Sequence, residues 1–248
     1  MLKISYKLKG LMLNELWFAS KMQLNKTMIM TGLYCYRQAT FDIDTIGLKK
    51  EKLYTLINDL RDDKEKIFST FKSNVRNEIR KADKIESFTL SCDYDSKEIF
   101  LEAYRDFAKA KNLPMINKKS IDKYGNNIFY IKGYLNGELT NIQLYLLDRE
   151  SGIVRLQHSI STLYKEQNIH RKAQIGWINH SLHWKTILEF KDLGFSTFDW
   201  GGYTNNPHSP LAGIDKFKAS HGGVKVVRYN YYTLPYYALK KIQERLFL

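Results

Sequence analysis

Apolar residues recur along the chain with two different spacings, which predict an ordered series of helices and strands. From Asp63 to Lys84 the apolar positions follow a helical period. A second helix is predicted from about Lys97 to Lys111, and Pro114 stops it. The first 45 residues, with the β-rich stretch TMIMTGLYCYRQATFDI, predict short strands. The apolar positions of the first helix are Phe68, Phe71, Val75, Ile79 and Ala82.

Three antiparallel strands are predicted between about residues 128 and 160. The runs IFYIKGYL and ELTNIQLYLLD flank the dipeptide Asn136-Gly137. Asn-Gly between β-rich runs is a strong hairpin signal, because both positions tolerate the positive φ of a type I′ turn. A turn from Arg149 to Gly152 then leads into the third run, IVRLQHSI.

The last third of the chain alternates helix and strand. A helix is predicted from about Gln174 to Leu193, with apolar residues around much of its circumference, so we expect it to be covered on more than one side. Gly194 follows as a typical residue after a helix end. The strand FSTFDW, a short helix with Phe217 and Lys218, the strand VKVVRYNYYTL and the helix PYYALKKIQERLFL complete the chain. This order is α+β and not the regular alternation of a doubly wound sheet.

Composition and charge limit the function classes. The chain has 248 residues, of which 44% are hydrophobic and 14% aromatic, as in a globular protein. It contains no apolar run of membrane-spanning length, and polar residues break the first twenty positions, so we expect a cytoplasmic protein. The net charge of +13 favours polyanionic partners, namely nucleic acid, anionic lipid headgroups or pyrophosphate-bearing metabolites. Peripheral association with the inner face of the membrane suits the same charge.

Several standard catalytic and metal-binding motifs are absent. The sequence has no GxGxxG after a strand, no GxxxxGK[ST], no HExxH and no GxSxG. His180 and His183 lie three residues apart on a helix, but no carboxylate or cysteine cluster accompanies them, so no metal site is predicted. Cys35 and Cys92 are far apart and are expected to be reduced thiols.

The stretch FDWGGYTNNPHSPLAGIDKFKASHGG carries the main candidate site. Asp199 ends a strand, where functional side chains often lie. Gly201 and Gly202 let the backbone approach a ligand closely, and Tyr203 follows them. Lys218, in the next element, could stabilise an oxyanion or a phosphate. The alternative is a tight strand–loop–helix connection with a solvated lysine, and the residue types alone do not separate the two.

Two segments together resemble the Fem family of peptidoglycan-bridge aminoacyltransferases and their smaller relatives, which share the Gcn5-related N-acetyltransferase (GNAT) fold. FSTFKSNVRNEIRKADK is similar to the family's Ser/Thr-x-x-Arg-x-x-Ile-Arg/Lys-Lys-Ala helix. LHWKTILEFKDLGFSTFDWGG…GIDKFKASHGG resembles the family's strand ending Asp-x-Gly-Gly and its Gly-[Ile/Leu]-x-x-Phe-Lys-x-x-x-Gly-Gly motif. The resemblance spans roughly residues 65 to 232. It implies a GNAT-type domain over residues 63–248, preceded by a β-rich extension over residues 1–62 that is a partial or degenerate first unit.

The resemblance also implies a reaction and roles for individual residues. The family moves an acyl or aminoacyl group from an activated ester or thioester to an acceptor amine. By motif, Lys218 would stabilise the oxyanion or the leaving oxygen with Phe217 packed beside it, and Asp199 would orient or deprotonate the amine. Arg76 and Arg80 would meet phosphates of the acceptor or carrier. From the residues alone, a solvated helix face is the favoured interpretation of these arginines.

The donor divides the possible functions. GNAT enzymes bind coenzyme A with a Gln/Arg-x-x-Gly-x-Gly/Ala loop, whereas the equivalent stretch here, STLYKEQNIHRKAQIGW, has Gly176 alone. The net charge and the cluster His170-Arg171-Lys172 suit a tRNA-borne donor, bound through salt-sensitive phosphate contacts. The N-terminal 60 residues are too short for a complete first Fem domain and no helical arm is visible, which leaves the acceptor open.

Three functions therefore follow from the sequence. The first is transfer from aminoacyl-tRNA to an amine of a cell-envelope precursor, such as a peptidoglycan stem, a nucleotide sugar or a lipid-linked sugar. The second is an N-acyltransferase that uses acyl-coenzyme A or an acyl carrier protein to acylate an amino sugar. The third is a non-catalytic basic module that binds RNA. No tightly bound cofactor is expected for any of them.

Overall fold

Ten strands form one continuous sheet in the computed structural model, which describes residues 1–246, and their order is β1-β2-β3-β10-β4-β9-β8-β7-β6-β5. The strands are β1 (Leu2–Leu8), β2 (Leu11–Trp17), β3 (Tyr34–Ala39), β4 (Leu48–Asp59), β5 (Phe88–Asp93), β6 (Ile128–Leu135), β7 (Glu138–Asp148), β8 (Ile153–Ser161), β9 (Thr197–Tyr203) and β10 (Val224–Thr233). The helices are α1 (Lys26–Thr31), α2 (Lys64–Ser69), α3 (Ser73–Ala82), α4 (Lys97–Lys111), α5 (Lys118–Asp122), α6 (Ile169–Asp192), α7 (Ala212–Ala219) and α8 (Leu234–Leu246), with short 3-10 turns η1 (Gly125–Asn127) and η2 (Thr162–Tyr164).

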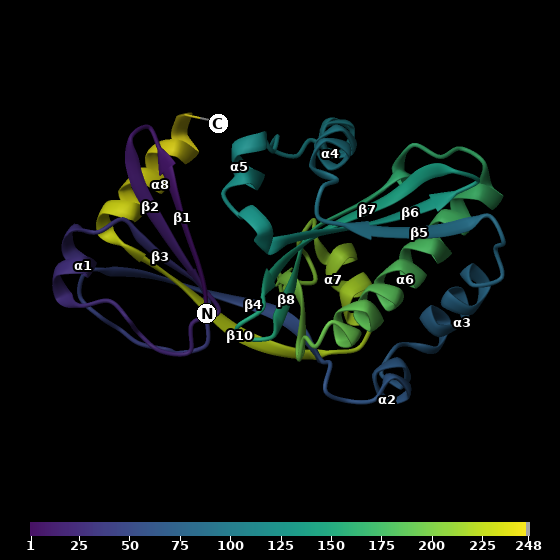
Figure 1. The fold of residues 1–248 in the computed structure, drawn as a ribbon, viewed down its shortest axis with the longest axis horizontal. Helices are drawn as coiled ribbons and strands as arrows, with labels where there is room; N and C mark the ends of the chain where they lie inside the picture. Colours follow the sequence, from purple (N-terminus) through teal and green to yellow (C-terminus); the bar gives the residue numbers. More distant parts are fainter. Residues whose placement is uncertain (247–248) are drawn as a thin grey trace.

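The long strands β4 and β10 join two parts of the sheet. β10 pairs with β4 from Val224↔Ile57 to Thr233↔Leu48, and with β3 through Tyr229–Tyr232. Figure 1 shows β1–β3 with α1 and α8 on one side of these strands, and β5–β9 with α2–α7 on the other. β4 also pairs with β9. Residues 1–62 thus supply a central strand of the sheet, and their division from residues 63–248 as an extension stays a prediction.

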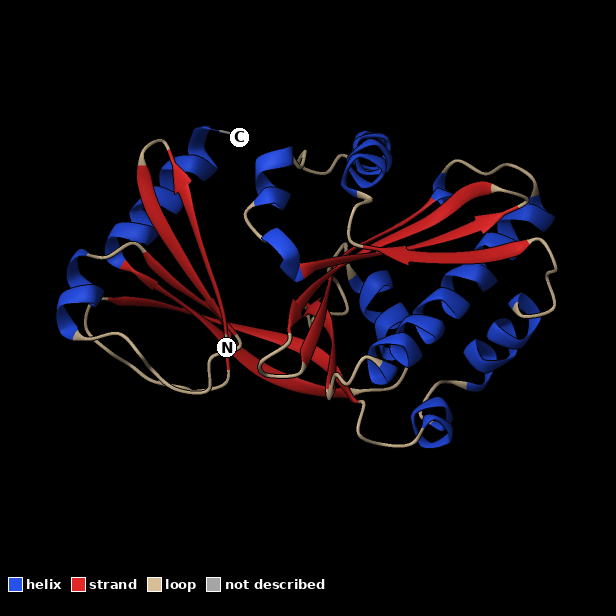
Figure 2. Cartoon of the chain, viewed as in Figure 1, coloured by secondary structure: helices blue, strands red, loops and turns tan. Residues whose placement is uncertain are grey.

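The predicted meander is confirmed as β6, β7 and β8. Asn136 and Gly137 have φ values of 53° and 75°, as a type I′ turn requires. Successive side chains of these strands point to opposite faces of the sheet and so belong to two separate hydrophobic cores. Phe129, Tyr145 and Val154 pack against α6, whereas Tyr130 and Leu144 pack against α4. The meander is therefore covered by helices on both faces, with α3, α6 and α7 on one and α4 with α5 on the other (Figure 2).

Two predicted elements differ from the structure. The helix expected over residues 63–84 is divided into α2 and α3, because Lys72 adopts an extended ψ of 147° and its N–H donates to Ser220 O at 2.9 Å. Part of the N-terminal stretch expected as strand is instead α1, where the Asn25 side chain accepts from Met28 N and starts the helix. The strands β4 and β5 were not predicted.

The other C-terminal predictions are confirmed. α6 begins five residues before the predicted start and contributes Leu182, Ile187 and Phe190 to the main core. It is followed by Gly194 with a positive φ of 84°, which is the conformation expected after a helix end. β9, α7, β10 and α8 then follow in the predicted order.

The neighbouring strands β8 and β9 separate after a short parallel pairing. They pair at Ile153↔Thr197, Val154↔Phe198 and Arg155↔Asp199, and no further. Both strands continue, β8 to Ser161 and β9 to Tyr203. The fork between them leaves unpaired backbone inside an otherwise continuous sheet, and unpaired strand backbone is available to a ligand or to other side chains.

Candidate functional site

A buried ion pair lies at the point where β8 and β9 begin to separate. Arg155 Nη1 lies 2.9 Å from Asp199 Oδ2, and both residues are almost fully buried. The other carboxylate oxygen accepts from Gly201 N at 2.8 Å and from the Thr55 hydroxyl. Three donors therefore hold Asp199, which offsets the cost of removing its charge from water. This arrangement fixes where β9 leaves the sheet.

The first glycine of the pair is required by the backbone. Gly201 has φ +78°, and a Cβ at this position would lie 2.8 Å from Leu156 O of β8. Gly202 does not have this constraint, because a Cβ there would meet nothing within 4 Å. Only a glycine at position 201 lets β9 turn this close to β8.

Lys218 returns from α7 to this glycine pair. Its Nζ donates to Gly202 O at 2.7 Å across sixteen residues of sequence. Burial, followed by the nearby charge of Arg155, lowers the pKa of Lys218 to about 8, and Asp199 opposes this effect. An ammonium group carries three protons, so donors remain for an oxygen of a bound molecule.

A pocket of about 540 Å³ opens beside Lys218. Leu156 and His183 are buried in its wall, whereas Lys111 and Lys172 are exposed residues of its lining. It lies next to the unpaired half of β8, where helices from both faces of the sheet can reach it. The lining residues are Phe107, Lys111, Leu156, Ser159, Ser161, Leu163, Tyr164, Lys172, Asn179, His183, Gly213, Ile214, Phe217 and Lys218.

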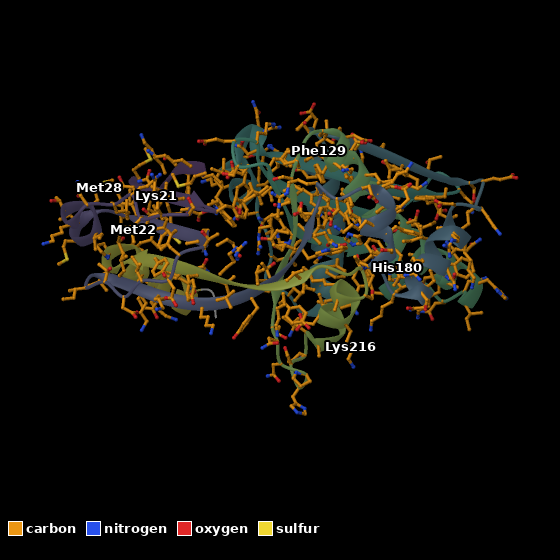
Figure 3. All side chains as sticks on the ribbon, turned by 90° about the horizontal axis from the view of Figure 1, so that it is seen from below. Lys21, Met22, Met28, Phe129, His180 and Lys216 are labelled. Atoms are coloured by element: carbon orange, nitrogen blue, oxygen red, sulfur yellow. The ribbon has the colours of Figure 1, made fainter. Side chains whose placement is uncertain are left out.

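Three histidines surround Phe217 between α6 and α7. The ring of His180 stacks on Phe217 with centroids 4.8 Å apart, and the His183 ring lies 5.4 Å from Phe217 in an edge-on arrangement. His221 lies 4.8 Å from Phe217. Figure 3 labels His180 on α6 and Lys216 on α7, which mark the two helices that meet here. The cluster fixes the helix turn that carries Lys218.

Hydrogen bonds order two of these histidines. His221 Nδ1 lies 3.0 Å from Phe217 O, so it carries the hydrogen, and His221 Nε2 then accepts from His180 Nδ1 at 3.0 Å. His180 Nε2 is 3.3 Å from Glu78 of α3. Burial lowers the pKa of His180 to about 4 and that of His221 to about 3, so both rings are neutral at neutral pH.

The structure brings together part of the predicted site. Phe217, Lys218 and Lys172 line the pocket, and Gly201 and Gly202 lie at the Lys218 ammonium. Asp199 lies beneath the glycines and is not among the lining residues. Tyr203 pairs with Tyr54 at the end of β9. Their assigned roles in binding and catalysis stay predictions.

Other predicted residues lie apart from the pocket. Arg76 donates to the backbone carbonyls of Ser69 and Phe71, and Arg80 donates to Asn77 at 3.0 Å. Both belong to α3, and neither lines the pocket. Arg171 forms ion pairs with Glu138 and Glu166, and His170 is exposed. Phosphate binding by these four residues stays a prediction.

Three residues near the site were not predicted. Arg155 meets Asp199 only through the register of β8 and β9. Burial lowers the pKa of Arg228 on β10, and the nearby negative charge of Asp199 opposes this effect. His183 was considered as a metal ligand and set aside. A polar residue on the apolar face of a helix was the available signal for it.

Solved structures of FemX and of lysylphosphatidylglycerol synthetase share the fold of this chain. FemX superposes with a TM-score of 0.67 at 11% identity, covering 97% of this chain and 85% of FemX. The C-terminal domain of a putative lysylphosphatidylglycerol synthetase from Agrobacterium fabrum has a TM-score of 0.57 at 9% identity, covering 98% and 84%. L-PGS from Bacillus licheniformis has a TM-score of 0.52 at 15% identity, covering 87% and 73%. No protein-family model and no curated protein sequence matches. The mixed sheet flanked by helices, together with these structural neighbours, confirms the predicted α+β fold.

Over residues 1–246, the structure has no helix that is both long and apolar enough to cross a membrane. The same residues hold no group of three or more histidine, cysteine, aspartate or glutamate side chains placed to bind a metal ion.

Proposed function

We propose that this protein transfers an aminoacyl group from aminoacyl-tRNA to an amine of a cell-envelope precursor. In this proposal, Lys218 donates a hydrogen bond to the oxyanion of the transition state. The observation that supports this most is the position of Lys218 Nζ, 2.7 Å from Gly202 O and in the lining of the pocket. In acyl transfer, charge develops on the carbonyl oxygen as the amine attacks. A positioned ammonium stabilises that charge in the transition state.

The remaining residues of the site support orientation. Phe217 packs beside Lys218 and forms part of the pocket wall. Asp199 holds Arg155 and the backbone of Gly201, so in this proposal it acts as a positioning residue for the glycine turn. Holding the two reactants in the correct geometry supplies a large share of such a rate enhancement.

The start of α6 favours the tRNA donor over coenzyme A. In GNAT enzymes the amides at the start of this helix bind the pyrophosphate of coenzyme A, because helix N-termini attract anions. Here Asn168 Oδ1 accepts from both His170 N and Arg171 N at 3.0 Å. These two amides therefore already have a hydrogen-bond partner within the chain. Lys111 and Lys172 at the pocket supply positive charge for a phosphate-bearing carrier.

Two structural neighbours support this choice of acceptor by their names. One is the domain of a putative lysylphosphatidylglycerol synthetase, whose name contains a phospholipid, and the other is FemX. A precursor that carries phosphate, such as a nucleotide-linked stem peptide or a lipid-linked sugar, fits the net charge of +13. This charge also suits a peripheral position at an anionic membrane surface, where such a lipid-linked acceptor would be found.

A transfer assay tests the donor. Total tRNA charged with labelled amino acids is incubated with the protein and with a nucleotide-linked peptidoglycan stem or an amino sugar. We expect labelled product that disappears after ribonuclease treatment and decreases steeply with salt. Product from acetyl-coenzyme A alone, insensitive to ribonuclease, would assign the donor to the thioester class. Binding of RNA without transfer from any donor would instead support the non-catalytic module.

A further inference from the structure

Acyl transfer to an amine requires a group that accepts a proton. The attacking nitrogen becomes positively charged as it bonds to the carbonyl carbon, and it must lose a proton before the amide is stable. Asp199 is poorly placed for this task. Its two oxygens already accept from Arg155, Gly201 N and Thr55, and it does not line the pocket.

His183 is the buried polar residue of the pocket wall that has no partner. Neither of its ring nitrogens has a hydrogen-bond partner, although the residue is fully buried. Such groups are rare in native proteins, since a buried polar atom without a partner has lost the hydrogen bonds that it would make with water. The two neighbouring histidines differ in this respect, because His180 and His221 are bonded to each other. Because His183 belongs to the pocket lining, a molecule bound in the pocket would be the nearest new partner for its ring.

The surroundings of His183 fix its orientation and its charge. The ring packs 4.9 Å from Trp200 and 5.4 Å from Phe217, so the helix turn of Lys218 and the end of β9 both contact it. Lys218 of α7, His221 and His180 are the titratable groups that act on it. Burial, and then these neighbours, hold the pKa of His183 well below its ordinary value. The ring is therefore neutral at neutral pH and has a free lone pair.

We propose that His183 is the proton acceptor of the reaction, on the premise that the proposed transfer is correct. The amine lone pair forms the new C–N bond while the carbonyl π electrons move to the oxygen, which Lys218 stabilises. One N–H proton of the resulting ammonium passes to the free ring nitrogen of His183. The oxyanion then re-forms the C=O bond and expels the carrier oxygen, which takes the proton from His183. A weak base suffices, since the ammonium of the adduct is more acidic than that of the free amine.

The test compares variants at position 183 with a variant of a second, partly buried histidine that packs against aromatic rings. His183→Gln keeps a hydrogen-bonding group without a base, and His183→Phe keeps the aromatic packing. His158→Gln is the control, because His158 is partly buried, packs against Phe100 and Tyr104, and does not line the pocket. Each variant is assayed for single-turnover transfer from charged tRNA across pH, and its melting temperature is measured alongside.

General base catalysis typically contributes about 10²–10⁴ in rate. We expect both His183 variants to lose transfer within this range, to lose the acid limb of the wild-type pH profile, and to keep their melting temperatures within a few degrees. Added imidazole should restore part of the rate in His183→Ala and none in Lys218→Met. His158→Gln should retain transfer.

Two results would overturn the assignment. One is transfer by folded His183→Gln or His183→Phe within about threefold of the wild type. The other is an equal loss in His158→Gln with unchanged pH profiles, which would show that His183 acts only through packing. A folded wild-type protein with no transfer from any donor is a separate outcome. It removes the proposed function itself, and the role of His183 with it.

Discussion

The ammonium of Lys218 donates to the carbonyl of Gly202 at 2.7 Å, and so joins α7 to the end of β9 across sixteen residues of sequence. This bond gives a structural basis to the separation between the lysine and the second glycine of the pair. The short helix carries the lysine back to the point where β9 leaves the sheet. The bond to Gly202 O uses one proton of the ammonium, so two remain for other acceptors.

Lys218→Met should lower kcat and kcat/KM together by about 10²–10³, because an oxyanion donor acts mainly in the transition state. Methionine keeps most of the apolar stem, so the change removes charge and leaves packing nearly intact. Steady-state transfer kinetics provide the measurement. Lys216→Met on the same helix is the control, since Lys216 is exposed and outside the pocket lining. Wild-type kinetics for Lys218→Met would remove the oxyanion role.

Gly201→Ala should destabilise the protein by about 2 kcal/mol or more, because it places a Cβ in a left-handed conformation and against Leu156 O at 2.8 Å. Gly202→Ala is the matched control for stability. Its Cβ meets nothing within 4 Å, and its φ is not in the positive range. Urea unfolding of the two variants measures the difference. Equal midpoints would show that β9 relaxes around the added methyl group.

Asp199→Asn should destabilise the fold by about 3–5 kcal/mol, since removing one partner of a buried ion pair leaves the Arg155 charge uncompensated. Lys118→Gln, which breaks the exposed pair with Glu98, should cost well under about 1 kcal/mol. The pH profile of transfer distinguishes two roles. If Asp199 only positions other groups, Asp199→Asn lowers kcat and keeps the shape of the pH profile. If Asp199 is the base, Asp199→Asn removes the acid limb of that profile.

The histidine cluster should make stability depend on pH. The pKa of His180 is lowered from 6.5 to about 4, and that of His221 from 6.5 to about 3. Between each lowered pKa and 6.5, the unfolded chain therefore binds more protons than the folded chain. Stability then rises with pH in that window, by roughly 1.4 kcal/mol per pH unit for each histidine. It is lost as the pH falls from 6.5 toward 4.

Urea unfolding at several pH values checks this expectation. His180→Gln should reduce the slope of stability against pH by about the contribution of one histidine. His208→Gln is the control, because His208 is exposed and lies outside the cluster. An unchanged slope in His180→Gln would mean that other groups control the acid sensitivity.

Lys172→Ala should raise the KM for charged tRNA and reduce the slope of log K against log salt by about 1, as expected for loss of one phosphate contact. Lys172 is exposed and belongs to the pocket lining. Lys7→Ala in β1 removes the same charge from an exposed position away from the pocket. An equal effect from both variants would assign binding to the overall charge of the protein.

The sequence by itself determined the regular elements whose signals are local. The Asn136-Gly137 turn defined a hairpin because its φ values depend on those two residues alone. Gly194 marked the end of α6 for the same reason. The motif around Gly201 and Lys218 contains Phe217 and Lys218, two of the α7 residues that line the pocket, and their roles stay predictions. These features depend on contacts between near neighbours, which the order of residues specifies directly.

Tertiary structure decided the elements and contacts that depend on distant partners. The helix over residues 63–84 divides because Lys72 bonds to Ser220, and no local signal records that partner. Arg155 reaches Asp199 only because parallel pairing of β8 and β9 ends there. His183 reads in the sequence as one more polar residue on a helix. Burial on two sides leaves its ring without a partner at the pocket, since burial depends on which helices and strands pack around it.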